Sequence, residues 1–210
     1  MDIAILTREE ANVSYTQIIE LIHESFQERL DQGLNYSCST MNVEQYKKKT
    51  KKGVVFVAID RATGNLAGTI TLNFLEKLRE KHGYMEYVAI KSNYKHCGIG
   101  SILVNRIRNY GIQEGCDYIL SDTSIKAISA VKFHLKNGFR IIGLESYRST
   151  NYWSYVFRMQ IKPSFLWSNP VFLKLHYWQS YFFMKMTRDI NGNDTTMGRI
   201  YKRMRELCRN

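Results

Sequence analysis

Two periodicities of apolar residues divide the chain into predicted helices and strands. From Tyr15 apolar residues recur at three- and four-residue steps as far as Leu30, which is typical of an amphipathic helix, and Gly33 is placed to end it. Further helices are predicted over 42–51, 99–110 and 127–136. Short apolar runs bounded by turn residues predict strands over 2–7, 54–59, 66–74, 84–90, 116–120, 139–145 and 152–161.

The order of these elements predicts the fold class. Strands come first, and a strand–helix–strand–helix–strand succession follows, which implies a mixed α/β fold with helices covering a sheet. Composition shifts after Pro163. Residues 1–161 are therefore interpreted as one domain, and residues 162–210 as a basic, aromatic-rich, helical C-terminal extension with nine Lys+Arg and three Asp+Glu.

Composition limits the classes of protein. The 210 residues are 44% hydrophobic and 23% charged, which excludes wholesale disorder. Four cysteines lie far apart with no C-x-x-C pair, and neither a secretory signal nor a membrane-spanning run is readable, so a cytoplasmic protein with reduced thiols is expected. The net charge of +11 favours anionic partners such as phosphate groups, nucleic acid or a membrane surface, without choosing among them.

The most informative stretch is the loop KHCGIG, which joins the strand ending near Ile90 to a helix. Gly98 and Gly100 lack a Cβ, so the backbone can approach a ligand closely. The N–H groups of such a loop and of the first helical turn converge where the helix dipole adds positive charge, and this arrangement binds a phosphate or pyrophosphate. The loop is neither a P-loop nor a dinucleotide fingerprint, and a glycine-rich turn without function is the alternative.

With its flanking strand and helix, K-x-x-G-x-G resembles the acyl-CoA-binding motif of the GNAT superfamily of N-acetyltransferases, whose loop usually begins with Gln or Arg where this chain has Lys95. Some thirty residues on, the family has N-x-x-A-x-x-F/L-Y-x-K-x-G-F. This chain matches that spacing with Ala127, Ala130, Phe133, His134, Lys136, Gly138 and Phe139. The resemblance covers residues 1–161 and implies a mixed, mostly antiparallel sheet that is splayed at the CoA site.

The resemblance also implies an acetyl-CoA-dependent transferase that needs no metal. The pyrophosphate of acetyl-CoA would lie on the amides of Lys95, His96, Cys97, Gly98, Ile99, Gly100 and Ser101. The pantetheine arm would pair with the backbone of Val88, Ala89 and Ile90, and an N–H near Ala89 or Ile90 would polarise the thioester carbonyl. A primary amine would then attack that carbonyl directly.

Three residues are candidates for proton transfer. His134 stands where the family has a tyrosine acid, and an unperturbed imidazole near pKa 6.5 is about one-quarter protonated at pH 7. It would donate to the CoA sulfur, or else it packs beside the ligand. Glu86 and Asp122 lie near positions where family members carry a base, and either could instead be a solvated strand-end carboxylate or a helix cap. Ala127 replaces the family's asparagine, which removes one side-chain contact to the pantetheine.

The acceptor is expected between two loops, at 34–40 and 146–152. Tyr36, Tyr147 and Arg148 could bind an anionic or sugar-like acceptor, and the alternative is that they are ordinary polar loop residues. A non-catalytic acyl-CoA sensor or scaffold, and a membrane-associated acyltransferase with a longer acyl donor, remain rival functions.

The C-terminal extension predicts one apolar helical face. Its members are Val171, Leu175, Trp178, Phe182 and Met186. Packing on the first domain or a homodimer contact is the favoured interpretation of this face. A membrane surface is the alternative, because an interfacial helix has the same pattern. No recognised nucleic-acid-binding module is present, so no nucleic acid is expected as a partner.

Overall fold

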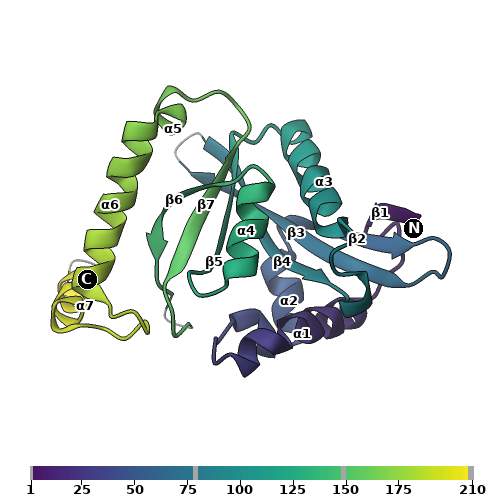
Figure 1. Cartoon of the computed structure of the whole chain (residues 1–210), viewed down its shortest axis with the longest axis horizontal. Helices are drawn as coiled ribbons and strands as arrows, with labels where there is room; N and C mark the ends of the chain where they lie inside the picture. The colour runs from purple at the N-terminus through teal and green to yellow at the C-terminus, as the bar shows by residue number, and fades with distance from the viewer. Residues whose placement is uncertain (1, 78–79, 148–149, 208–210) are drawn as a thin grey trace. The chain divides into compact units, whose positions relative to one another are not determined.

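The computed structural model describes residues 2–77, 80–147 and 150–207. It contains both strands and helices (Figure 1). In chain order they are β1 (Ile3–Thr7), α1 (Tyr15–Asp31), η1 (Ser37–Thr40), α2 (Val43–Thr50), β2 (Gly53–Asp60), β3 (Leu66–Lys77), β4 (Glu80–Ile90), η2 (Ser92–Tyr94), α3 (Ile99–Gln113), β5 (Tyr118–Ser124), α4 (Ile128–Lys136), β6 (Arg140–Glu145), β7 (Ser154–Gln160), α5 (Phe165–Ser168), α6 (Pro170–Thr187) and α7 (Thr196–Leu207).

The strands form a seven-stranded sheet in the order β1-β2-β3-β4-β5-β7-β6. The pairs β1–β2, β2–β3, β3–β4 and β6–β7 are antiparallel, and β4–β5 is parallel. The predicted mixed α/β fold with a mostly antiparallel sheet and a helical C-terminal extension is confirmed.

The chain forms two compact units. The N-terminal unit comprises Met1–Ser121 and Met159–Lys162, and the C-terminal unit comprises Asp122–Arg158 and Pro163–Asn210. The domain boundary after residue 161 stays a prediction.

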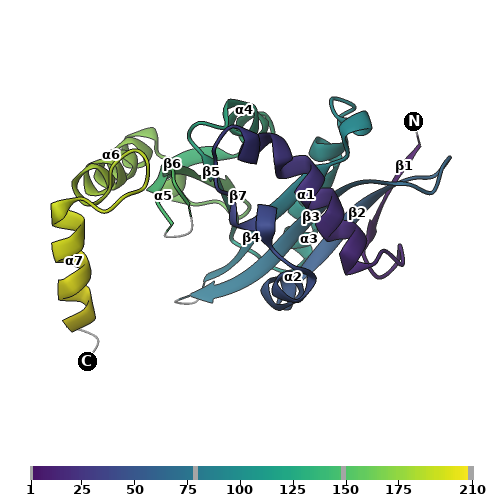
Figure 2. The same cartoon turned by 90° about the horizontal axis from the view of Figure 1, so that it is seen from below.

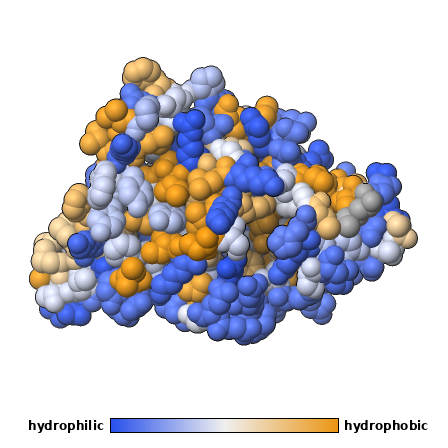
Figure 3. All heavy atoms as spheres, in the orientation of Figure 1, coloured by the Kyte–Doolittle hydropathy of each residue, from blue (hydrophilic) through white to orange (hydrophobic). Residues whose placement is uncertain are grey.

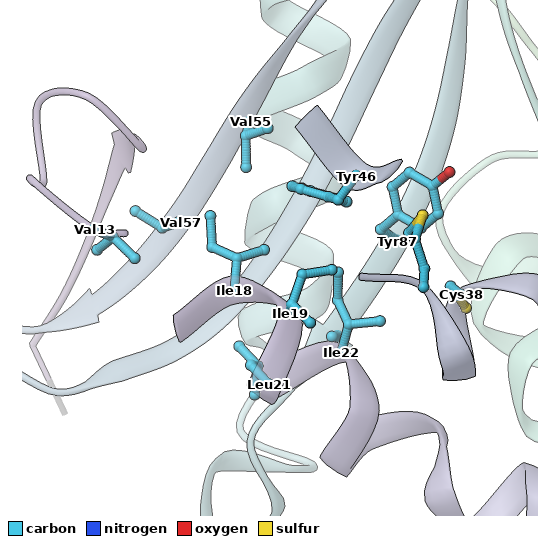
Figure 4. Packing of buried hydrophobic residues seen from close by; sticks show 12 residues of the cluster. Val13, Ile18, Ile19, Leu21, Ile22, Cys38, Tyr46, Val55, Val57 and Tyr87 are labelled. Carbon is cyan, nitrogen blue, oxygen red and sulfur yellow. The ribbon is translucent and has the colours of Figure 1, made fainter. Parts of the chain in front are cut away.

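In the N-terminal unit, α1 and α2 cover one face of β2–β4 and α3 covers the other (Figures 1 and 2). The apolar positions of α1 supply the core beneath it, and Ile18 and Ile22 are completely buried. Figure 4 shows these side chains with Val57 of β2 and Tyr46 of α2. Burial of this apolar stripe is the main force that holds α1 on the sheet.

Two strands extend beyond their predicted ends. β3 continues to Lys77 and β4 begins at Glu80, because the two strands pair along their whole length as far as Lys77 and Glu80. The residues involved are largely charged, so their composition predicts a loop rather than a ladder. β5 begins at Tyr118 and continues to Ser124, although its second half is polar.

In the C-terminal unit, α4 and α6 accompany β6 and β7. Leu144, Trp153 and Met184 form a small buried cluster, against which Tyr177 and Tyr181 of α6 pack. The predicted apolar face of α6 does not take part in this cluster. Among the described helices, none is long and apolar enough to cross a membrane.

Candidate functional site

The loop after β4 is held by a buried tyrosine. Tyr94, the last residue of η2, is buried, and its hydroxyl donates to Asp60 Oδ2 at 2.9 Å. Beyond it the chain is exposed and turns sharply, with φ at +65° in His96 and +81° in Gly98. A Cβ at Gly98 would meet no atom within 4 Å, so the backbone conformation, rather than lack of space, requires glycine.

This loop leaves a run of amides available. The N–H of Lys95 donates to the Ser92 carbonyl at 3.3 Å, and the N–H of Ser101 donates to the Gly98 carbonyl at 3.0 Å. Between them, within the described residues, the N–H groups of residues 96–100 make no backbone hydrogen bond. They lie at the N-terminus of α3, where unpaired amides and the helix dipole favour an anion.

Hydrogen bonds connect helix α1 to the segment that leads into the loop. Ser25 Oγ donates to the Ile90 carbonyl at 3.1 Å, and Ser92 Oγ donates to Glu24 Oε1 at 2.9 Å. Lys95 Nζ lies 3.8 Å from Glu28 Oε2, an exposed pair that contributes little free energy. The loop is thus fixed from two sides, while the amides of residues 96–100 make no backbone hydrogen bond.

A β-bulge interrupts β4 just before the predicted pantetheine-binding residues. Tyr87 and Val88 together stand opposite Ile70 of β3, and Tyr87 has φ at +53°. Such a φ is uncommon for a bulky residue. The bulge turns backbone groups of β4 out of the ladder with β3, immediately ahead of Ala89 and Ile90.

The ladder between β4 and β5 is short. β4 and β5 pair in parallel from His82 opposite Tyr118 only as far as Tyr84. The next link is a side chain, since Ser121 Oγ donates to the Met85 carbonyl at 3.1 Å. In the described part of the N-terminal unit, the ladder between β4 and β5 therefore ends before the bulge.

Glu86 lies on the same strand and has a fixed orientation. Asn73 Nδ2 donates to Glu86 Oε2 at 2.5 Å, and Asn73 itself is buried. Nearby, the hydroxyls of Tyr46 and Thr71 are 2.9 Å apart. Burial raises the pKa of Tyr46 and, with the neighbouring Glu86 carboxylate, that of Tyr87, so both phenols stay protonated.

His134 lies in the C-terminal unit, buried among aromatic rings. It stacks on Phe157 with ring centroids 4.4 Å apart. Its Nδ1 is 2.7 Å from the Ala130 carbonyl, and a carbonyl can only accept, so Nδ1 carries the proton. Burial lowers the pKa of His134, which favours the neutral ring. This environment gives more support to packing than to proton donation.

The structure describes three of the four other predicted site residues. Asp122 is half-buried within β5 rather than at its end. Tyr147 donates its hydroxyl to Glu145 Oε2 at 3.0 Å. Tyr36, in the N-terminal unit, makes an edge-to-face contact with Phe26, with ring centroids 5.2 Å apart. Arg148 lies outside the described residues.

Comparison with known proteins decides the family. The acetyltransferase (GNAT) family matches residues 15–139, which is more than half of the chain. The chain belongs to the GNAT acetyltransferase family. The predicted resemblance is therefore confirmed. The matched region includes the loop, the bulged strand and α4.

Solved GNAT structures share the fold. A structure of the NatC complex bound to Gag peptide and CoA is 19% identical over 76% of this chain and 99% of that chain, with a TM-score of 0.61. An N-acetyltransferase from Staphylococcus aureus Mu50 is 22% identical over 77% and 99%, with a TM-score of 0.59. The IAA acetyltransferase from Bacillus cereus ATCC 14579 is 14% identical over 76% and 99%, with a TM-score of 0.56. At these identities the similarity shows the fold alone.

Sequence reasoning missed two residues of this GNAT site. Asn73 is a polar residue within an apolar run of β3, and that departure from the pattern can be recognised in the sequence. The bulge at Tyr87 left no signal in the sequence, because it depends on the register between β3 and β4. Within the described residues, no group of three His, Cys, Asp or Glu side chains is placed to hold a metal ion.

Proposed function

We propose that the protein is an N-acetyltransferase that transfers the acetyl group of acetyl-CoA directly to a primary amine. One observation carries the proposal: amides at residues 96–100 that make no backbone hydrogen bond, at the N-terminus of α3, follow a bulged strand whose ladder with β5 ends at Tyr84. The amides suit the pyrophosphate, and the edge of Val88–Ile90 suits the pantetheine amides. A similar GNAT structure, that of the NatC complex, was solved with CoA bound.

The chemical step requires a neutral amine. Its nitrogen attacks the thioester carbonyl carbon, the carbon–sulfur bond breaks, and CoA leaves as a thiolate. Backbone N–H groups at the bulge, near Ala89 or Ile90, would stabilise the negative charge that develops on the carbonyl oxygen. An alkylammonium near pKa 10.4 must first lose a proton, which costs on the order of 4.6 kcal/mol at pH 7.

We assign that proton to Glu86, directly or through water. The hydrogen bond from Asn73 at 2.5 Å fixes the carboxylate, so it does not need to be oriented during the reaction. Asp122 is the alternative base. His134 stays the candidate for protonating the thiolate, although its neutral, Nδ1-protonated ring favours a packing role. Tyr36, Tyr147 and Arg148 are retained as candidate contacts of the acceptor.

Calorimetry with acetyl-CoA tests the loop. In Gly98→Val a β-branched residue replaces the glycine at φ +81°, and we expect the dissociation constant to rise at least about tenfold. Gly115→Val is the matched control, because Gly115 has φ at +75° and open space around it just beyond the C-terminal end of α3, at the opposite end of that helix from the loop. Equal losses of binding in both variants, or no binding by the native chain, would refute the proposal.

A panel of primary amines, with release of free thiol as the readout, tests the transfer. Turnover with an amine supports the enzyme, whereas tight binding of acetyl-CoA without thiol release supports a sensor. Glu86→Gln should lower kcat/KM by about a hundredfold and remove its acidic limb, since a positioned base contributes about 10²–10⁴. Glu76→Gln changes an exposed residue of β3 and is the control. It should leave both kcat/KM and its acidic limb unchanged.

A further inference from the structure

The inner face of α6 carries two polar side chains that bond to β6, beside the buried Met184. His176 Nδ1 lies 2.7 Å from the Ile142 carbonyl, and the N–H of Leu144 donates to Ser180 Oγ at 3.0 Å. Ile142 and Leu144 belong to β6, the last strand of the sheet order, so these side chains cover backbone groups at a strand edge. Gly143 between them leaves room for Ser180, whose Oγ would lie 3.0 Å from a Cβ added there.

The outer face of α6 is apolar and uncovered. Because His176 and Ser180 face β6, the predicted apolar face points away from it. Its members are between 50% and 65% exposed: Val171, Leu175, Trp178, Phe182 and Met186. In Figure 3, hydrophobic residues reach the surface over the C-terminal helices at the left of the view. From Val171 to Met186 this stripe is about 22 Å long.

The charges beside the stripe are all positive. Lys174 and Lys185 are exposed, and the helical period places both along one edge of the stripe. The sequence of Pro170–Thr187 contains no Asp or Glu. Long lysine side chains beside an apolar surface can bury their methylene groups and extend the ammonium outwards.

Helix α7 repeats the pattern and contacts α6. Phe183 and Tyr201 meet edge to face, with ring centroids 5.3 Å apart. One face of α7 carries exposed apolar residues, namely Met197, Ile200, Tyr201 and Met204. Exposed basic residues lie elsewhere on this helix, namely Arg199, Lys202 and Arg203, and its sequence contains one acidic residue, Glu206. Two neighbouring helices of one unit thus combine exposed apolar faces with an excess of positive charge.

We propose that the outer face of α6, with α7 beside it, docks on the surface of a lipid bilayer that contains anionic headgroups. The stripe is straight and one helix wide, as a helix lying in the interface plane requires, and Trp178 is a residue type enriched at that depth. Lys174 and Lys185 then meet the headgroups. Docking is a property of the C-terminal helices and does not depend on the acetyl-transfer proposal.

Charge favours a bilayer over a second copy of the chain. A copy of α6 offers the two lysines no counter-charge, because the helix has no acidic residue. Paired stripes would bring like charges towards the same contact, and like charges placed close together are unfavourable. Anionic headgroups supply the missing counter-charge over the whole length of the stripe.

Co-sedimentation of the full chain with vesicles tests the apolar contact. The chain should bind vesicles of phosphatidylcholine mixed with phosphatidylglycerol more strongly than vesicles of phosphatidylcholine alone. Leu175→Ser/Phe182→Ser should lower the partition coefficient at least about tenfold. Leu75→Ser/Ile112→Ser is the matched control, because it removes two exposed apolar side chains from β3 and α3. The control should bind as the native chain does.

Two further variants test charge and orientation. Lys174→Gln/Lys185→Gln should weaken binding about thirtyfold at low salt, whereas Lys48→Gln/Lys49→Gln, with the same change of net charge on α2, should have little effect. Vesicles should shift the tryptophan emission to the blue, and Trp178→Phe should remove most of that shift.

Three results would overturn docking. The first is a native chain that binds neither kind of vesicle. The second is equal weakening by the α2 and α6 charge variants, which would make the attraction a property of the net charge alone. The third is a concentration-dependent dimer in analytical ultracentrifugation that Leu175→Ser/Phe182→Ser dissociates, which would identify a second copy as the occupant.

Discussion

Helices α1 and α6 have similar apolar periodicity and use it in opposite ways. In α1 the apolar stripe is the covered face, and Ile18 and Ile22 are completely buried. In α6 the covered face carries His176 and Ser180 together with the buried Met184, while the predicted apolar stripe is exposed. The two helices meet different surfaces of a sheet: α1 packs on the side chains of β2–β4, whereas α6 faces the backbone edge of β6.

Periodicity therefore predicts a helix and its apolar face, but does not predict which face is covered. A sheet face presents side chains and favours apolar partners. A strand edge presents N–H and C=O groups that favour hydrogen-bonding partners. The position of β6 at the end of the strand order therefore determines the orientation of α6, and no local pattern in residues 170–187 contains that information.

The largest expected difference between α1 and α6 is in the free energy of unfolding, when one apolar side chain is removed from each helix. Ile22→Ala leaves a cavity in the core and should lower the free energy of unfolding by about 3 kcal/mol. Leu175→Ala removes a side chain that is 65% exposed and should change it by less than about 0.5 kcal/mol. Urea denaturation followed by circular dichroism measures both. Comparable losses would show that the stripe of α6 is covered in solution.

The next effect concerns the polar anchor of α6. In Ser180→Ala the N–H of Leu144 loses its acceptor, which should cost about 1–2 kcal/mol and speed hydrogen exchange at that amide. Gln179→Ala, at the exposed neighbouring position, is the control and should alter neither quantity. If the two variants behave alike, the hydrogen bonds to β6 do not orient the helix.

Most of the fold could be predicted because its elements carry local signals. The stripe of α1 and the turn at 60–65 define their elements without tertiary information, and the structure places them as predicted. The extension of β3 and β4 to Lys77 and Glu80 could not be predicted, because charged residues there are held by pairing with the opposite strand. The polar end of β5 is a similar case, since Ser121 is stabilised by a carbonyl of β4.

Some features of the candidate site could likewise be predicted from the sequence, and others could not. The glycine spacing around Gly98 predicted the loop, because a φ of +81° strongly favours glycine at that position. The bulge at Tyr87 and the partnership of Asn73 with Glu86 depend on the register between strands, which single residues do not encode. The neutral state of His134 depends on rings contributed by β7 and by residues outside its own helix.

A smaller effect should appear in the pH dependence of stability, because α4 also turns a polar ring inwards. Burial lowers the pKa of His134 in the folded chain below the unfolded value of about 6.5. Its contribution to stability is therefore complete above pH 6.5 and is lost as the pH falls through the folded pKa, with a slope of at most about 1.4 kcal/mol per pH unit. His134→Phe should flatten that slope in urea titrations between pH 7 and pH 5. An unchanged slope would mean that the ring is accessible to protons in the folded state.

The smallest expected effect is that of removing an N-terminal cap, which should cost the same free energy in α1 and in α6. Ser14 caps α1 by accepting from the N–H of Gln17 at 3.2 Å, and Asn169 caps α6 by accepting from the N–H of Val171 at 2.9 Å. Both caps satisfy end amides that any helix leaves unpaired, whichever face is covered. Ser14→Ala and Asn169→Ala should therefore each cost about 1 kcal/mol, measured by hydrogen exchange in the first turn of the altered helix. A much smaller loss in α6 would show that its first turn is held by side-chain contacts instead, and would weaken the contrast between the anchored inner face and the uncovered outer face.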